Sequence, residues 1–344
     1  MMRRREFVGL AAGLLLASAG RLRAEHQIIS EDPLIVVSDL QSLQGRYTRV
    51  EEFYVRNHFD APAIVNPPSL RIEGEVAKPQ FVSPGALVGF PTQKTGAVLE
   101  CAGDPTRAIS LVSDGVWEGW ALGDILELAR PLPAGKYLHL SGRDGFSRSV
   151  PVHRALNGGL LVTSLNGRPL TRNHGAPWRA LFPGWYGMDS VKWLEKIVVA
   201  SSPLPIVGFT YVEITKNAFG GASMGPLPPI QVKSVITAPA GGAVLHRGQV
   251  RISGLAWSGT GRIASVDIRA SGEGNWRPAV LDRSASHYDW VLWSVSFDLE
   301  RPGVVDFVSK ATDSAGNVQP EKRDPQRVDS YAYNVCETIR CIVV

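Results

Sequence analysis

Cysteine is scarce in this sequence, which limits what disulfides can contribute to its stability. The 344 residues include three cysteines, Cys101, Cys336 and Cys341. In an oxidising compartment two of them could pair, and one would be left over. If residues 336–341 form one extended strand, however, the step spans about 16 Å and the two side chains face opposite ways, so a disulfide there would require a bend. We therefore expect Cys336 and Cys341 to be unpaired or separately buried.

Several common functional motifs are also absent. The sequence has no CxxC or HExxH zinc spacing, no Walker loop, no GxGxxG after a strand and no CxxCH haem-attachment motif. It has no basic run, no RNA-binding motif and no apolar run long enough to span a bilayer as a helix. These absences argue against a structural zinc site, a nucleotide-binding loop, covalently bound haem, nucleic-acid binding and a membrane span in the mature chain.

The small excess of positive charge comes from the N-terminus. The chain has 36 Lys and Arg against 32 Asp and Glu, a formal charge of +4. Residues 1–24 contain five arginines and one glutamate, which leaves 31 basic residues (36 less 5) and 31 acidic residues (32 less 1) in the remainder. No global basic field then remains to attract nucleic acid.

The first 24 residues resemble an export signal. The motif around Arg4 and Arg5 (RRREFV) is similar to a twin-arginine signal, and the apolar run that follows, residues 9–19, is too short to span a bilayer. We predict that residues 1–24 are a removable signal peptide, with cleavage after Ala19 or Ala24, and that the mature protein is periplasmic. An uncleaved amphipathic anchor is the alternative. Twin-arginine export carries folded proteins, often with a cofactor already inserted.

Length and composition predict two β-rich domains. A chain of 344 residues can bury two substantial cores. A composition of 44% hydrophobic and 20% charged residues, with 35 Gly and 24 Pro, is typical of a soluble, loop-rich protein. The Gly- and Pro-rich stretch 218–229 predicts the boundary between the domains. We expect a first domain over residues 33–222 and a second over residues 230–344.

Short strands dominate both predicted domains. In the first domain, Leu122, Ile125 and Leu126 have helical spacing and predict one helix over residues 117–130. The strands predicted for that domain cover residues 69–77, 97–101, 137–140, 148–152, 160–165 and 195–200. Those predicted for the second domain cover residues 232–236, 249–257, 264–270, 290–299 and 304–312. Short strands at this spacing indicate an immunoglobulin-like β-sandwich, and the predicted fold class of the whole chain is α+β, mainly β.

The stretch 171–194 combines basic residues with a backbone that cannot form regular structure. It offers His174, Arg179 and Lys192 between several glycines and prolines. Cationic side chains and closely approaching backbone N–H groups on such a loop suit a bound anion. A surface loop with scattered basic residues is the alternative. Five aromatic residues within the stretch favour the anion site, because most of them must be buried.

Cys101 and the polar residues after Val55 are ambiguous when the residues are considered alone. Cys101 ends a predicted strand and precedes a strong turn signal. It can be a buried small hydrophobe, a catalytic nucleophile paired with a histidine, or a metal thiolate. The triplet 56–58 follows a short apolar strand, which on spacing alone is an ordinary strand-to-loop boundary.

The motifs taken together resemble those of one family. FYVRNH at 53–58, ECAG at 100–103, NGRPL at 166–170, HGAPWR at 174–179, and PGWYG followed by SVKWL up to residue 194 are similar to the sulfite oxidase family of molybdopterin enzymes. In the second domain, KSVITAP, GLAWSGTGRIASVDI and DSAGNVQP resemble the immunoglobulin-like dimerisation domain of that family. The resemblance covers most of residues 45–335 and includes no b5-type haem domain.

The resemblance implies roles for individual residues. Cys101 matches the thiolate that ligates molybdenum, and the residues matched to catalysis or substrate binding are Arg56, Trp117, Tyr211 and Arg262. The residues matched to binding of the pterin and its phosphate are Tyr54, Val55, Arg56, Asn57, His58, Asp144, His174, Arg179, Ser190, Val191 and Lys192. The chain departs from the family pattern in two places. Asp104 stands where the family typically has asparagine, and the family's active-site tyrosine has no clean match, Tyr211 being the nearest candidate.

The function implied by the resemblance is oxidation of sulfite to sulfate on a molybdenum–molybdopterin cofactor, with electrons passed to a periplasmic c-type cytochrome. The family also implies a homodimer and a pterin without an attached nucleotide. One alternative on the same cofactor is reduction of an S-oxide or N-oxide, which the two departures favour. An alternative of a different class is a non-catalytic periplasmic binding protein.

Overall fold

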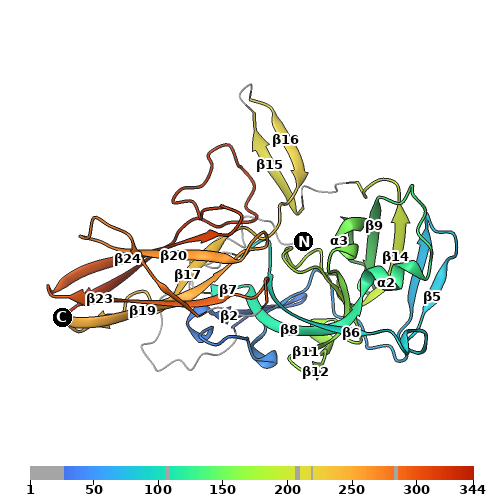
Figure 1. Ribbon diagram of the computed structural model, residues 1–344, viewed down its shortest axis with the longest axis horizontal. Coiled ribbons are helices and arrows are strands. Elements are labelled where there is room, and N and C mark those ends of the chain that lie inside the picture. Colours follow the sequence, from blue (N-terminus) through green and yellow to red (C-terminus); the bar gives the residue numbers. More distant parts are fainter. Residues whose placement is uncertain (1–26, 105–108, 206–209, 218–219, 283–285) are drawn as a thin grey trace.

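The protein consists of two β-rich bodies joined along one side (Figure 1). The computed structural model describes residues 27–104, 109–205, 210–217, 220–282 and 286–344. The predicted signal peptide therefore lies outside the described residues. No helix within these ranges is long and apolar enough to cross a membrane.

The first body contains three sheets. One sheet joins β1 (Gln27–Glu31), β2 (Leu34–Asp39) and β3 (Val55–Arg56), with β7 (Ile109–Ser110) beside β2. The second has the order β10 (Ser147–Pro151), β9 (Tyr137–Gly142), β14 (Leu194–Ala200), β4 (Leu70–Gly74) and β5 (Gln80–Val82). The third has the order β12 (Arg168–Pro169), β11 (Leu160–Leu165), β8 (Val112–Ala121) and β6 (Thr92–Glu100), with β13 (Arg179–Leu181) beside β11.

Helical structure in the described chain is confined to short segments between the strands. The α-helices are α2 (Leu122–Glu127) and α3 (Val152–Leu156). The 3-10 turns are η1 (Leu40–Ser42), η2 (Val50–Glu52), η3 (Pro84–Leu87) and η4 (Arg172–His174). The helix predicted over residues 117–130 is therefore wrong in its first part. Residues 117–121 instead end strand β8, because that strand pairs with β6 on one side and β11 on the other, and this pairing overrides local helical spacing.

The second body is the predicted two-sheet sandwich. One sheet has the order β17 (Lys233–Ala238), β19 (Gly248–Trp257), β23 (Val291–Leu299) and β22 (Val280–Asp282). The other has the order β18 (Val244–Leu245), β25 (Thr338–Val343), β24 (Gly303–Asp313), β20 (Ile263–Ala270) and β21 (Arg277–Pro278). Inward-facing residues alternate with outward-facing ones along β20 and β24, as expected for strands packed on one face.

The three cysteines are not bridged. Cys341 lies in β25, where its side chain is buried in the sandwich core. Cys336 precedes that strand, and its Sγ lies 3.7 Å from the carbonyl oxygen of Gln319. The expectation that Cys336 and Cys341 remain unpaired is confirmed.

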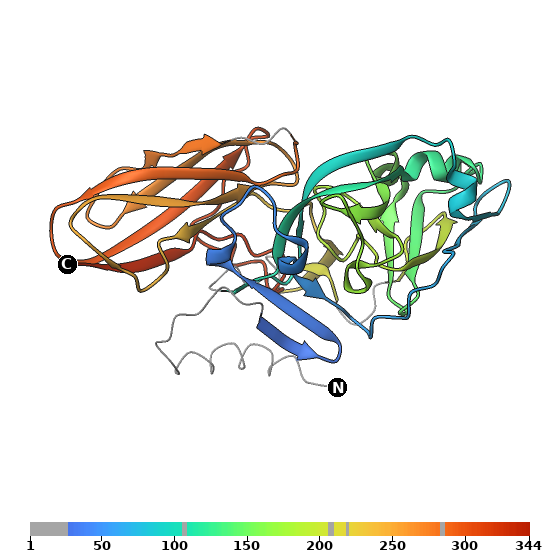
Figure 2. The same cartoon turned by 90° about the horizontal axis from the view of Figure 1, so that it is seen from below.

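A β-hairpin stands at the junction of the two bodies. Strands β15 (Val212–Lys216) and β16 (Ala222–Pro226) pair antiparallel, and Figure 1 shows the hairpin projecting away from both sheets of the sandwich. The stretch 218–229 that predicted a boundary therefore contains one strand of this hairpin, β16. Figure 2 shows the N-terminal strands β1 and β2 lying near the junction of the two bodies.

The two bodies share a hydrophobic cluster. Tyr186 and Tyr211 from the first body pack in it with Leu255, Trp257 and Trp290 from the second. All five are buried, with exposed fractions of 8% or less. Burial of large aromatic side chains across a domain junction is typical of domains that do not move independently.

A close backbone contact between Gly184 and Gly259 brings the bodies together. A Cβ atom at Gly259 would lie 2.1 Å from the carbonyl oxygen of Gly184 and 2.8 Å from the backbone nitrogen of Ile230. The same carbonyl oxygen accepts a hydrogen bond of 2.9 Å from the Ile230 N–H. Only glycine fits at position 259 without displacing backbone atoms.

We expect Gly259→Ala to separate the bodies locally and to lower the free energy of unfolding by about 1–3 kcal/mol, the usual cost of overpacking a tight site. Gly274→Ala is the matched control, because a Cβ there would meet no atom within 4 Å. Urea denaturation of both variants measures the effect. Equal stabilities for the two variants would show that this contact does not constrain the junction.

Candidate functional site

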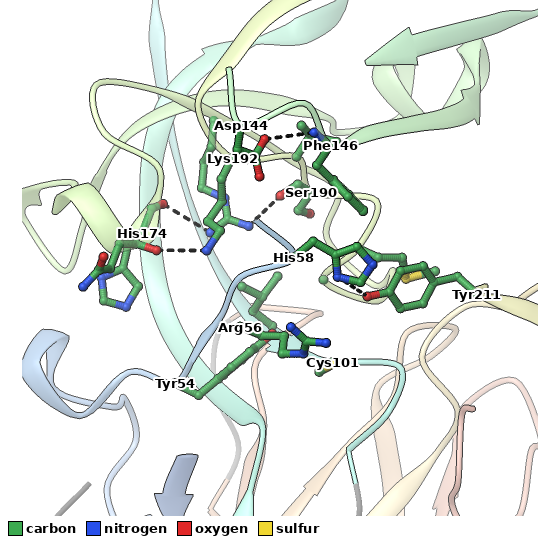
Figure 3. Close-up of a pocket in the computed structure, with 16 residues that line it drawn as sticks. Tyr54, Arg56, His58, Cys101, Asp144, Phe146, His174, Ser190, Lys192 and Tyr211 are labelled. Atoms are coloured by element: carbon green, nitrogen blue, oxygen red, sulfur yellow. Dashed lines mark hydrogen bonds between the residues drawn. The ribbon is translucent and has the colours of Figure 1, made fainter. Parts of the chain in front are cut away.

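Side chains from well-separated parts of the first body converge on one cavity (Figure 3). They come from β3 and the residues on either side of it, the end of β6, the β9–β10 turn, the stretch 173–192 and the residue before β15. The lining residues are Tyr54, Arg56, His58, Leu99, Cys101, Asp144, Phe146, Asn173, His174, Arg179, Gly187, Met188, Ser190, Val191, Lys192 and Tyr211.

Cys101 reaches the cavity from the end of β6. Its backbone N–H donates to the carbonyl oxygen of Leu111 at 2.9 Å, and its own carbonyl oxygen accepts from the Asp104 N–H at 2.9 Å. The turn that follows the strand therefore holds the thiol in a defined position. Burial raises the pKa of the Cys101 thiol, and the nearby positive charge of Arg56 opposes that rise. A positively charged ligand such as a metal ion would favour the thiolate.

Asp104 does not face the cavity. Its side chain is buried, and its Oδ1 accepts hydrogen bonds from the backbone N–H of Leu111 at 2.6 Å and from the hydroxyl of Ser110 at 3.2 Å. Its Oδ2 lies 3.6 Å from the ammonium group of Lys233 in the second body. This carboxylate is therefore paired with a cation and does not line the cavity.

Arg179 is buried without a carboxylate partner among the described residues. It lies in β13, and its guanidinium donates to the carbonyl oxygens of Ser190 at 2.6 Å and His174 at 3.2 Å. Burial lowers the pKa of Arg179 to about 10. Carbonyl oxygens hold the side chain in place but leave its charge uncompensated.

Lys192 is held in the same way. Its Nζ donates to Oδ1 of Asn57 and, at 3.0 Å, to the carbonyl oxygen of Asn173. Burial lowers the pKa of Lys192 well below its usual range, and the charges of Arg179 and Arg56 lower it further, while Asp144 opposes them. Within the described ranges, neither Arg56 nor Lys192 forms an ion pair.

His58 and Tyr211 form a stacked pair on the other side of the cavity (Figure 3). Their rings lie 5.4 Å apart with an interplanar angle of 29°, and the Tyr211 hydroxyl is 3.4 Å from Nδ1 of His58. Burial lowers the pKa of His58 to about 4, assisted by the charges of Arg56 and Arg148, so the imidazole is neutral at pH 7. Burial also raises the pKa of Tyr211, so its hydroxyl keeps its proton and remains a hydrogen-bond donor.

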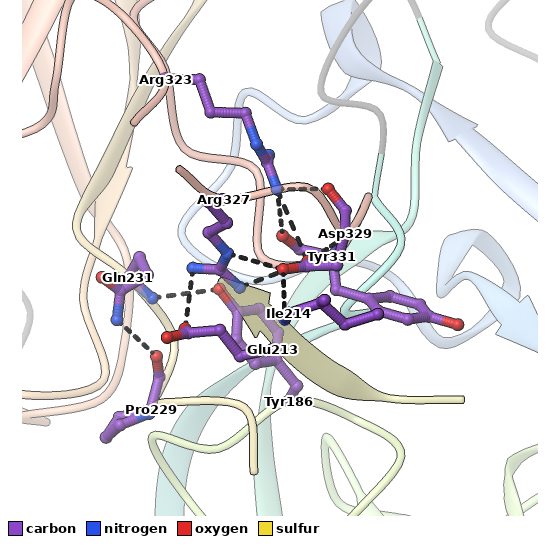
Figure 4. A network of polar contacts seen from close by, with 9 residues as sticks. All are labelled: Tyr186, Glu213, Ile214, Pro229, Gln231, Arg323, Arg327, Asp329 and Tyr331. Atoms are coloured by element: carbon purple, nitrogen blue, oxygen red, sulfur yellow. Dashed lines mark hydrogen bonds and ion pairs between the residues drawn. The ribbon is translucent and has the colours of Figure 1, made fainter. Parts of the chain in front are cut away.

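A segment of the second body fixes the chain beside Tyr211 (Figure 4). The buried carboxylate of Asp329 accepts hydrogen bonds from the backbone N–H of Ile214 at 3.0 Å and of Tyr331 at 2.8 Å. Arg327 donates to the same carboxylate at 3.0 Å, and the Tyr331 ring lies 5.3 Å from the Tyr211 ring. Tyr211 has a positive φ of 55°, which is uncommon for a residue other than glycine. Its place at the cavity thus depends on both bodies.

Most of the residues predicted for the site line this cavity, and four do not. Val55 is buried in β3, and Asn57 lies behind Lys192 with its Nδ2 buried and without a hydrogen-bond partner in the described chain. Trp117 is fully buried, with its indole N–H donating to the carbonyl oxygen of Ala97 at 3.1 Å. Arg262 is exposed in the second body, where its backbone N–H donates to Ser314. The substrate roles of Trp117 and Arg262 stay predictions.

Five uncharged residues of the lining, Gly187 among them, were not predicted from the sequence. Leu99, Phe146, Asn173 and Met188 all line the cavity. Asn173 and Met188 fall within the basic stretch already singled out, so their proximity to His174 and Ser190 was the available signal. Phe146 follows the predicted turn near Asp144, but nothing in its local pattern distinguishes it from an ordinary core aromatic.

The two bodies match two known family models. Residues 58–206 match the oxidoreductase molybdopterin binding domain, and residues 227–335 match the Mo-co oxidoreductase dimerisation domain. The chain is 30% identical to sulfite oxidase from Gallus gallus, an alignment that covers 87% of this chain and 74% of that protein. It is 32% identical to mitochondrial sulfite oxidase from Drosophila melanogaster, over 80% of this chain but only 56% of that protein.

A solved structure has the same fold over nearly the whole chain. The crystal structure of the sulfane dehydrogenase SoxCD from Paracoccus pantotrophus superposes with a TM-score of 0.84 and 26% identity. The match covers 95% of this chain and 90% of that one. The two-body arrangement described above is therefore shared with that protein.

The lowered pKa of Lys192 predicts a pH dependence in protein purified without cofactor. Below the lowered pKa both folded and unfolded chains hold the proton, so the cost of burying the charge is fully present. Between that pKa and the ordinary value of 10.5 only the unfolded chain holds it, so stability rises with pH, by at most about 1.4 kcal/mol per pH unit. The free energy of unfolding of the wild type, compared with that of Lys192→Met, should therefore rise as the pH increases from the lowered pKa to 10.5.

Urea denaturation of both proteins between neutral pH and pH 10.5 measures this difference. Lys136→Met, which removes an exposed lysine, is the control and should show no such trend against the wild type. A pH-independent difference between wild type and Lys192→Met would show that Lys192 is not destabilised by burial.

Proposed function

Because this chain belongs to the sulfite oxidase family of molybdopterin-dependent oxidoreductases, we propose that it oxidises sulfite to sulfate and passes the electrons to a c-type cytochrome. The family and its molybdenum–molybdopterin cofactor are shared with the relatives described above. The observation that carries the choice of substrate is the convergence of the Cys101 thiol with Arg56 and a protonated Tyr211 hydroxyl on one cavity.

The residues at the cavity fit the cofactor on structural grounds. Arg179 and Lys192 are desolvated cations held only by neutral oxygens, and the buried Nδ2 of Asn57 has no partner in the described chain. Such donors suit the phosphate and polar edges of a pterin. Cys101 offers the soft sulfur ligand that molybdenum requires. When bound, the molybdenum supplies the oxygen-atom transfer and accepts two electrons.

The chain's own groups then bind and orient an anionic substrate. Overall, sulfite and water give sulfate, two protons and two electrons. Arg56 lies close enough to Cys101 to influence its pKa, so its guanidinium can attract the doubly charged substrate and orient its oxygens. The Tyr211 hydroxyl retains its proton and can donate a hydrogen bond to a substrate oxygen. Neutral His58 stacks on Tyr211 and keeps the phenol ring in one orientation.

The two departures from the family pattern, at Asp104 and at the active-site tyrosine, no longer favour oxide reduction. Asp104 is paired with Lys233 and turned away from the cavity, and Tyr211 does line it. A second candidate is oxidation of sulfur at the sulfane level, favoured by the likeness to the sulfane dehydrogenase across 95% of this chain. The non-catalytic alternative is not compatible with membership of this enzyme family.

Cellular location and electron acceptor complete the proposal. The twin-arginine motif in residues 1–24 supports export of the folded, cofactor-loaded enzyme to the periplasm. A c-type cytochrome is an acceptor of suitable chemistry there, because re-oxidation of the centre needs two one-electron steps. The second body supports a homodimer, since it matches the dimerisation domain of the family.

The deciding experiment is steady-state reduction of cytochrome c or ferricyanide by protein whose molybdenum content has been measured on the same sample. Saturable reduction that depends on sulfite is expected. Turnover with a sulfane-sulfur substrate and none with sulfite, by fully loaded enzyme, would replace the proposed substrate with the second candidate. A loaded enzyme that turns over neither would contradict the proposal.

Cys101→Ser should lower turnover by more than about 100-fold, because loss of an outer hydrogen-bond partner of a metal ligand alone costs roughly 10–100-fold. The fold should be retained, since the substitution changes the side-chain volume little at a strand end. Activity assays together with circular dichroism measure both outcomes. Wild-type turnover in a folded Cys101→Ser protein would remove Cys101 from the metal site.

A further inference from the structure

Lys233 of the second body is buried against the short segment that carries Cys101. Its side chain is 1% exposed, and its ammonium group lies 2.5 Å from Oε1 of Glu100, whose side chain is also 1% exposed. Trp257, again from the second body, donates its indole N–H to the other oxygen of Glu100 at 2.7 Å. Both oxygens of the residue that precedes Cys101 are therefore held by the second body.

The same lysine reaches the other end of the segment. Its ammonium group lies 3.6 Å from Oδ2 of Asp104, on the turn that follows Cys101. Lys233 thus stands between two carboxylates on either side of the thiol residue, and neither carboxylate lines the cavity. The cluster has one positive and two negative groups, all buried, so removal of the lysine would leave two carboxylates without a cation.

Backbone hydrogen bonds connect this cluster to the cavity wall. The Glu100 carbonyl oxygen accepts from the Gly187 N–H at 2.7 Å, and Gly187 lines the cavity. The Ala102 carbonyl oxygen accepts from the Ala332 N–H of the second body at 2.7 Å. A displacement of Glu100 therefore moves the Cys101 backbone and the cofactor-binding stretch together.

One carboxylate of the cluster lies at a position where this chain departs from the family pattern. Asp104 stands where the resembled family typically has a neutral asparagine, and that acidic group is the one that Lys233 approaches at its second contact. Burying an acidic residue beside a metal ligand would be costly without this cation. The lysine and the aspartate are thus suited to each other across the domain junction.

We propose that Lys233 is a positioning residue for Cys101: by holding Glu100 and Asp104 at both ends of the segment 100–104, it sets the direction in which the Cys101 sulfur enters the cavity. This inference rests on the proposed role of Cys101 as the molybdenum ligand and deepens it. It makes the geometry of the metal site in the first body depend on a charged residue of the second.

The test compares Lys233→Met with the wild type in the full chain. In loaded enzyme, the thiolate-to-molybdenum absorption band and the electron paramagnetic resonance g-values of the singly reduced centre report the orientation of the sulfur. Both should shift in the variant, and kcat for sulfite should fall by about 10–100-fold while KM changes much less. Values indistinguishable from those of the wild type would overturn the proposal.

A second readout does not need the loaded enzyme. In cofactor-free protein carrying Cys336→Ser and Cys341→Ala, Cys101 is the only thiol. Its rate of alkylation by iodoacetamide reports the accessibility of the sulfur, and adding Lys233→Met should change this rate by severalfold. An unchanged rate would contradict the proposal independently of any catalytic result.

Controls separate positioning from general stability. Trp293→Phe perturbs the core of the same sandwich without touching Glu100, and its indole N–H makes no hydrogen bond within the described chain. Its spectra and alkylation rate should match the wild type even if it melts at a lower temperature. Equal spectral changes in Trp293→Phe and Lys233→Met would assign the effect to loss of stability and overturn the positioning role.

Two further variants keep the outcome interpretable. Lys233→Met combined with Glu100→Gln removes one of the two uncompensated charges and keeps the Trp257 contact, so it should recover part of the wild-type spectrum. If Lys233→Met alone does not fold, the double variant replaces it in the spectroscopic and alkylation measurements. Spectra of the double variant identical to those of the wild type would then overturn the proposal. If Cys101→Ser retains the thiolate-to-molybdenum band, the assignment of Cys101 as the metal ligand is wrong. If the band is lost in Cys101→Ser but is the same in Lys233→Met as in the wild type, Cys101 is the ligand and only the proposed role of Lys233 is refuted.

Discussion

Uncompensated positive charge around one cavity is the constraint on which this structure depends. Arg179 and Lys192 are anchored by carbonyl and amide oxygens, which fix their positions without neutralising them. A buried cation in a protein is usually paired with a carboxylate. Neither Arg179 nor Lys192 forms such an ion pair within the described residues. An anionic cofactor supplies the negative charge that these two side chains lack. Folding of the first body and binding of the cofactor are therefore coupled through Arg179 and Lys192.

The strands of the first body explain how residues so distant in sequence reach this cavity. The ends of β3 and β6, the β9–β10 turn and the irregular stretch before β14 all open toward it. The second body then secures the two groups closest to the chemistry. Its residues hold the segment around Cys101 and the chain beside Tyr211, so the cavity is a product of both bodies although the first supplies its lining.

The sequence predicted the architecture and the charged lining better than the details of the site. Alternating strands and turn residues are local signals, and the β11 prediction over residues 160–165 coincides with the strand observed. The helix predicted over residues 117–121 was wrong, because these residues end β8, and pairing with strands on both sides overrides the local helical pattern. No local signal could reveal that Lys233 pairs with Glu100, since 133 residues separate them. Tyr211 was named through the resemblance to the family, but its ring contact with Tyr331, 120 residues further along the chain, could not be read from the sequence.

The ion pair across the junction has an evolutionary consequence. Many two-domain enzymes can exchange one domain for another, because each unit keeps its own charges balanced. Here the first body contains Glu100 and Asp104 and the second contains the lysine between them, so a recombined chain that inherited only one half would bury charged groups without their counter-ion. Exchange of either body for an unrelated domain would therefore have to supply or remove these charges at the same time.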